Sequence, residues 1–83
     1  MRTPSIHRNG TGKVELVEGY ERAARALHDA LRALADAAPN ARDYYVQGDD
    51  AYAQARREHE ERLRRVESTC KEITELLEHC ADA

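Results

Sequence analysis

The residues best suited to bind a planar, charged ligand lie in one segment, Pro39 to Gly48, between two long helical patterns. The chain has four Tyr and neither Phe nor Trp, so Tyr44 and Tyr45 carry half of its capacity to stack on an aromatic partner. The guanidinium of Arg42 can hold a carboxylate or a phosphate through two hydrogen bonds. Polar side chains that can read the edges of a base complete this candidate site: Asn40, Asp43 and Gln47.

The same segment fits a structural alternative. A Tyr pair between two helices often covers the end of the helical core, and an Arg-Asp pair such as Arg42 and Asp43 can fix a loop. The composition alone leaves both interpretations open.

A second candidate for anion binding is the N-terminal segment from Ile6 to Lys13, which opens a helix with two glycines. Free backbone amides at a helix start, together with the helix dipole, favour negative charge. The segment is not a P-loop, because Val14 stands where Ser or Thr is required and no strand precedes it. The alternative is a flexible helix start with incidental charge. The candidate ligand-binding residues here are His7, Arg8, Asn9, Gly10, Thr11 and Lys13.

Catalytic and metal-binding motifs are missing, so we expect no enzyme, no cofactor and no metal site. His59 falls on an apolar stripe, which favours a packed or interface histidine, and His28 has no evident partner. Cys70 and Cys80 lie about 15 Å apart along one predicted helix, too far for a disulfide. Both fall on the apolar face, so we expect buried small side chains; the alternatives are an intermolecular disulfide or metal ligation. With His79 they lack the paired spacing of a zinc site.

Composition limits the class of protein. The chain has 83 residues, enough for one small domain, and its 13 basic and 16 acidic residues give a net charge of −3. Glu interrupts every Arg cluster, which argues against binding DNA. No stretch approaches the roughly 20 apolar residues of a membrane span, and no apolar run marks a signal peptide. We therefore expect a soluble, cytoplasmic protein.

Two amphipathic helices, 13–38 and 49–81, must position the candidates. Pro39 ends the first helix, and Asp49 or Asp50 is expected to cap the second. The first apolar stripe comprises Leu16, Tyr20, Ala23, Leu27, Ala30, Leu31 and Leu34. The second comprises Tyr52, Ala55, His59, Leu63, Val66, Cys70, Ile73, Leu77 and Cys80. Ion pairs four residues apart are expected on the opposite face at Glu58/Arg62, Glu60/Arg64, Glu61/Arg65 and Glu67/Lys71.

These elements predict an all-α antiparallel hairpin, with 1–12 as an extended basic arm and 39–48 as the loop. Its core is too thin to stand alone, so we expect a homo-oligomeric bundle, most simply a dimer of hairpins. Gly19, inside the first helix, fits a close approach of another backbone. Arm and loop would lie some 40 Å apart in one chain. A site combining them would need two chains packed antiparallel.

The arm "SIHRNGTGKVELVEGYERA" and the loop segment "APNARDYYVQGDDAYAQARREHEERL" resemble a group of small proteins from tailed bacteriophages and prophages. The pattern joins an Ile-His-x-Asn-Gly-Thr arm to a Pro-Asn-x-Arg-Asp-Tyr-Tyr-x-Gln-Gly loop and an Arg-Glu-His segment. It spans nearly the whole chain, and the loop is its specific part. The matching positions are His7, Asn9, Gly10, Thr11, Asn40, Arg42, Asp43, Tyr44, Tyr45, Gln47, Gly48 and His59.

The resemblance implies a phage origin and the host bacterial cytoplasm as the place of action. Some small oligomeric phage proteins act as sponges, sequestering the nucleotide messengers of host immunity between subunits. By this analogy we expect a non-enzymatic protein that holds an anionic, nucleotide-derived molecule in pockets between subunits. The alternative is a protein-protein module that inhibits a host protein or assists phage assembly, with the Tyr pair as its anchor.

Overall fold

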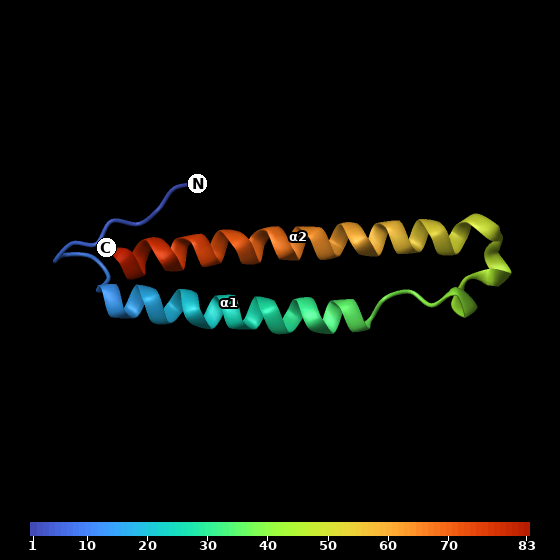
Figure 1. Ribbon diagram of the computed structural model, residues 1–83, viewed down its shortest axis with the longest axis horizontal. Helices are drawn as coiled ribbons and strands as arrows, with labels where there is room; N and C mark the ends of the chain where they lie inside the picture. Colours follow the sequence, from blue (N-terminus) through green and yellow to red (C-terminus); the bar gives the residue numbers. More distant parts are fainter.

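The computed structural model describes residues 1–83 and consists of two α-helices that run antiparallel, side by side (Figure 1). Helix α1 spans Lys13–Asp36 and helix α2 spans Asp49–Asp82. Two short 3-10 helices, η1 (Ala41–Asp43) and η2 (Tyr45–Gln47), lie in the connection between them. The molecule measures 61 × 20 × 17 Å. The all-α hairpin predicted from the two apolar stripes is confirmed.

Both helices begin at the predicted residues, Lys13 and Asp49, and only their C-terminal ends differ slightly from the prediction. Helix α1 stops at Asp36, two residues early. The Ala37 amide is shared between the carbonyls of Ala33 and Leu34, and the Ala38 amide bonds three residues back, to Ala35, so the chain tightens before Pro39. Helix α2 is capped by Gly48, whose φ of 112° lies in a region that glycine adopts readily and other residues rarely do. The prediction that Asp49 or Asp50 caps this helix is therefore wrong. Both carboxylates lie in its first turn, where they suit the positive end of the dipole.

The predicted stripes form the contact between the helices. Every stripe position of α2 is buried or half-buried, and so are those of α1 with one exception. Ala30 is exposed, while Leu31 turns inward. Two helices enclose little space, and only His59, Cys70 and Cys80 are buried, at 6%, 5% and 0% exposure. The two cysteines are buried, as expected, and do not bridge to each other.

No atom lies within 4 Å of where a side chain on Gly19 would begin, so no backbone within the hairpin approaches this glycine closely. The expected approach could come only from another chain. One prediction about the helix surfaces is wrong. None of the four predicted ion pairs forms on α2. Arg64 instead donates a 2.6 Å hydrogen bond to Glu61, three residues before it, and this bond lowers the pKa of the Glu61 carboxyl. Neither helix is both long and apolar enough to cross a membrane.

Candidate functional site

The backbone of the loop is held by hydrogen bonds of its own. The side-chain oxygen of Asn40 accepts a 3.1 Å bond from the Arg42 amide and caps η1. The Asn40 carbonyl accepts a further 3.0 Å bond from the Asp43 amide. Asn40 thus acts within the loop, and its side-chain oxygen is already engaged. This local network presents the neighbouring side chains from a defined backbone.

The two adjacent tyrosines have different environments. Tyr44 is half-buried, and its ring centroid lies 6.4 Å from that of Tyr52 at a tilt of 46°. This geometry is that of a packed aromatic pair, so Tyr44 closes the end of the core as the structural alternative predicts. Tyr45 is 74% exposed and Val46 is 78% exposed. Of the predicted stacking pair, only Tyr45 presents its ring to solvent.

The remaining loop candidates are free. Arg42 and Asp43 are both exposed and form no ion pair with each other. The ion pairs of the chain lie on α1 and α2. The structural alternative, in which an Arg-Asp pair fixes the loop, is therefore not the one that forms. Gln47 is exposed as well, and its side-chain amide forms no hydrogen bond within the chain. Together these groups offer a guanidinium, a carboxylate and an amide beside the ring of Tyr45.

The arm lies at the other end of the hairpin, beside the C-terminal turn of α2 (Figure 1). Lys13 donates a 2.7 Å hydrogen bond from Nζ to the carbonyl oxygen of Ala83. His79 donates from Nε2 to the carbonyl oxygen of Pro4 at 3.1 Å. The ammonium group of Lys13 is thus engaged within the chain. Arm and loop lie at opposite ends of the molecule (Figure 1), as the sequence predicts for a single hairpin.

The arm also contains a tight turn. The amide of Gly10 bonds to the carbonyl of His7 at 3.1 Å, and the His7 ring covers Gly10. A side chain at Gly10 would begin 2.8 Å from Nε2 of that ring, so the exposed His7 ring would have to shift to admit one. Arg8, Asn9 and Thr11 are exposed on this turn. His7 and Gly10 therefore shape the arm, and the other three present their side chains to solvent.

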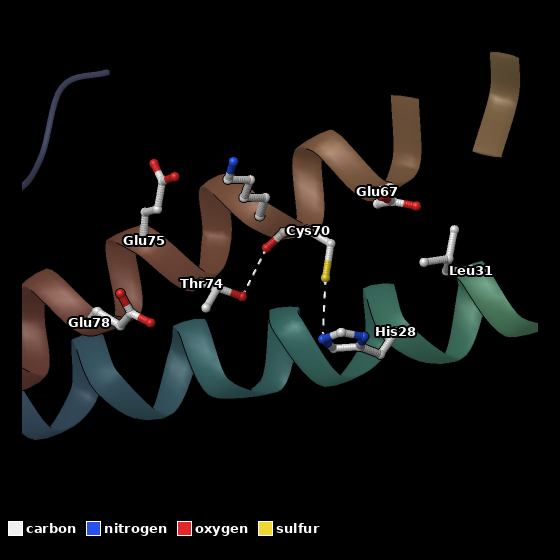
Figure 2. A pocket seen from close by; sticks show the side chains of 8 residues that line it. His28, Leu31, Glu67, Cys70, Thr74, Glu75 and Glu78 are labelled. Carbon is white, nitrogen blue, oxygen red and sulfur yellow. Dashed lines mark hydrogen bonds between the residues drawn. The ribbon is translucent and has the colours of Figure 1, made fainter. Parts of the chain in front are cut away.

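Two histidines in the middle of the hairpin make contacts across the helices. His59 donates a 2.7 Å hydrogen bond from Nε2 to the carbonyl oxygen of Leu34, so it is a packed histidine as expected. His28, which showed no partner in the sequence, has Nε2 at 3.4 Å from Sγ of Cys70 (Figure 2). The sequence does hold a signal for this pair: Cys70 lies on the α2 stripe, and His28 lies next to the α1 stripe.

The His28–Cys70 pair lies in an open groove of about 570 Å³ between the two helices. Most of its lining residues are of polar type, and no group of three or more His, Cys, Asp or Glu side chains is arranged to hold a metal ion. The lining residues are His28, Leu31, Glu67, Cys70, Lys71, Thr74, Glu75 and Glu78 (Figure 2). None of them was a predicted ligand-binding residue.

Comparison with protein-family models, with curated proteins and with solved structures finds no match to this chain. The resemblance to phage and prophage proteins stays a prediction.

Proposed function

We propose that this protein is a non-enzymatic binding protein that sequesters an anionic, nucleotide-derived small molecule at the loop 39–48. The observation that carries the proposal is the pairing of two exposed, unengaged groups, Arg42 and Tyr45, on a loop held by its own hydrogen bonds. Arg42 would hold a phosphate and Tyr45 would stack on the base. Asp43 and Gln47 would read its polar edges.

The loop by itself has too little positive charge to hold several phosphates, so we propose that a second chain supplies more. Asp43, Asp49 and Asp50 outnumber Arg42 there, so one guanidinium alone is a weak attraction for several phosphates. The segment 1–13 carries Arg2, Arg8 and Lys13 and no acidic residue. In an antiparallel pair of hairpins the arm of one chain would meet the loop of the other and supply positive charge. Lys13 would first leave its bond to Ala83.

The exposed area supports such an assembly. The chain exposes 6382 Å², whereas a compact monomer of its 9.4 kDa mass exposes about 5,000 Å². The excess is larger than the roughly 800 Å² that each partner buries in a stable interface. A homo-oligomer, a dimer or higher, would cover the half-buried stripe residues that the hairpin leaves open. We propose that its pockets lie between subunits.

The biological setting is part of the same proposal and rests on the sequence pattern of arm and loop. A phage protein of this kind would act in the bacterial cytoplasm as a sponge for the nucleotide messengers of host defence. Its task would be immune evasion, which requires tight binding and no catalysis. The cyclic dinucleotides, the cyclic trinucleotides and the derivatives of ADP-ribose are the ligand classes to examine.

A thermal-shift assay against these three classes tests the proposal. A ligand at 100 times its Kd adds about 2.7 kcal/mol of stability, which should raise the Tm by several degrees. Arg42→Ala and Tyr45→Ala should each abolish the shift without altering the oligomer. Arg25→Ala is the matched control, because Arg25 is exposed on α1, far from the loop, and pairs with no acid. No shift with any ligand at high excess would refute the proposal, and a monomer by light scattering would refute the intersubunit pocket.

A second function is favoured by a different observation. Tyr45 and Val46 are adjacent, 74% and 78% exposed, and together form an apolar tip on a polar molecule. Such a pair can anchor a protein-protein contact, either on a host protein or in phage assembly. In that case Val46→Ser should abolish capture of the partner in a pull-down, and nucleotides should give no thermal shift. Under the first proposal Val46→Ser should leave the thermal shift in place.

A further inference from the structure

The groove in the middle of the hairpin holds a nucleophilic side chain that the proposed function does not use. Cys70, from α2, has its sulfur 3.4 Å from Nε2 of His28, from α1 (Figure 2). When Nε2 carries no proton, the thiol donates a hydrogen bond to it. The same contact allows His28 to accept the thiol proton as the sulfur reacts. A thiol with a base in hydrogen-bond reach is the arrangement that activates cysteine nucleophiles.

Both side chains come from the interiors of long helices, so their relative position is well defined. Cys70 occupies a stripe position where an aliphatic side chain would pack, yet its partner across the interface is an imidazole. The residue is 5% exposed, and it lines the groove together with the exposed His28. Cys80 offers a contrast on the same helix, because it is 0% exposed and lines no groove.

The rim of the groove determines which reagents can approach. The lining includes three carboxylates, from Glu67, Glu75 and Glu78, and a single ammonium group, from Lys71. His28 is the only titratable side chain that α1 adds to the lining. The rim is therefore negative at neutral pH, and it repels an anion while it admits a neutral or positive molecule.

We propose that Cys70 and His28 form a thiol-modification site that takes a neutral or cationic carbon electrophile from the groove. The sulfur forms a bond to the electrophilic carbon, and the leaving group departs with the electron pair of the bond that breaks. The thiol proton passes to Nε2 of His28 and from there to water. No oxidant or reductant is needed. This reaction is independent of the loop and its ligand.

Alkylation of the intact protein tests the proposal, with iodoacetamide as the neutral probe and iodoacetate as the anionic one. Trypsin separates the two cysteines, because Cys70 falls in the peptide 66–71 and Cys80 in the peptide 72–83. Mass spectrometry of the two peptides then gives a rate for each thiol. At pH 7 the rate of Cys70 with iodoacetamide should fall about tenfold or more in His28→Gln, since a positioned base is lost. His28 is exposed, and circular dichroism of the variant checks that the hairpin stays folded.

The negative charge of the rim is tested by comparing the alkylation rates of Cys70 with the neutral and the anionic probe. The ratio of the iodoacetamide rate to the iodoacetate rate at Cys70 should be several times higher in the folded protein than in urea, where the rim is dispersed. The double variant Glu67→Gln/Glu75→Gln should lower that ratio and keep the iodoacetamide rate within about twofold. A Cys70 rate that is unchanged or higher in His28→Gln would overturn the proposal. An equal ratio in the folded and unfolded chains would overturn the selectivity for neutral and cationic electrophiles.

Discussion

Nε2 of His59 in α2 donates a 2.7 Å hydrogen bond to the carbonyl oxygen of Leu34, in the last turn of α1. Carbonyls in that turn lack the partners that the rest of a helix provides. The Leu34 carbonyl accepts the Ala37 amide at 3.1 Å and receives the imidazole as a second donor. A side chain of one helix thus completes the end of the other and fixes the register in which the two helices lie.

We expect His59→Leu to lower the free energy of unfolding by about 1–2 kcal/mol, because leucine fills a similar volume but cannot donate a hydrogen bond to the Leu34 carbonyl. Urea unfolding at a fixed protein concentration measures the change. Glu58→Gln is the control, since Glu58 is exposed and has no ion pair, and it should stay within about 0.5 kcal/mol of the parent. A His59→Leu variant as stable as the parent would show that the bond does not stabilise the hairpin.

Two glycines should respond to alanine in opposite directions. Gly48 has a φ of 112°, so Gly48→Ala strains the start of α2 and should cost about 1–2 kcal/mol. Gly19 lies inside α1 with open space around it, so Gly19→Ala should stabilise by up to about 1 kcal/mol. Thermal denaturation of both variants beside the parent gives the comparison. Loss of the oligomer in Gly19→Ala would instead reveal a neighbouring chain packed against that glycine.

The two tyrosines of the loop should separate stability from binding. Tyr44→Ala removes the ring that packs on Tyr52 and should lower the Tm by several degrees, since such a pair adds about 0.5–1.5 kcal/mol beyond its buried area. Tyr45→Ala removes a ring that is 74% exposed and should leave the Tm within about 2 °C. Differential scanning calorimetry without ligand checks both. Equal losses would mean that Tyr45 also packs, in which case it is not the free stacking group.

The Glu61–Arg64 pair predicts a dependence of stability on pH. The hydrogen bond from Arg64 lowers the pKa of the Glu61 carboxyl in the folded chain, so the folded state holds its proton less tightly than the unfolded state does. The contribution is therefore present above the ordinary pKa of Glu and is lost as the pH falls through the lowered value. Glu61→Gln should have a slightly lower Tm than the parent at pH 7, and the two should converge in acid. A constant difference across this range would contradict the assignment.

Much of the fold follows from periodicity alone. Apolar residues at three- and four-residue spacing define which face of each helix turns inward, and all nine positions predicted for α2 do so. The N-cap of α2 was harder to predict, because Asp49 and Gly48 are both good caps and only the direction of the incoming chain decides between them. Ala30 and Leu31 compete for one interface position, and the bulkier side chain takes it.

The candidate sites were harder to predict than the helices. Composition correctly marked the loop as the place where polar and aromatic groups gather, yet it could not tell Tyr44 from Tyr45. Their difference depends on which ring can reach Tyr52 after η1 turns the chain. The His28–Cys70 pair was missed because it depends on the register between two helices, and each stripe by itself is compatible with several registers.

The length of the hairpin changes how its mass must be measured. Its radius of gyration, 18.4 Å for 83 residues, is that of a compact protein of roughly 270 residues. A lone chain should therefore elute from a gel-filtration column ahead of globular standards of 9.4 kDa, because elongation raises the hydrodynamic radius. Its rotational diffusion will be anisotropic for the same reason. The number of subunits must be counted by a method that weighs the particle, such as light scattering or sedimentation equilibrium.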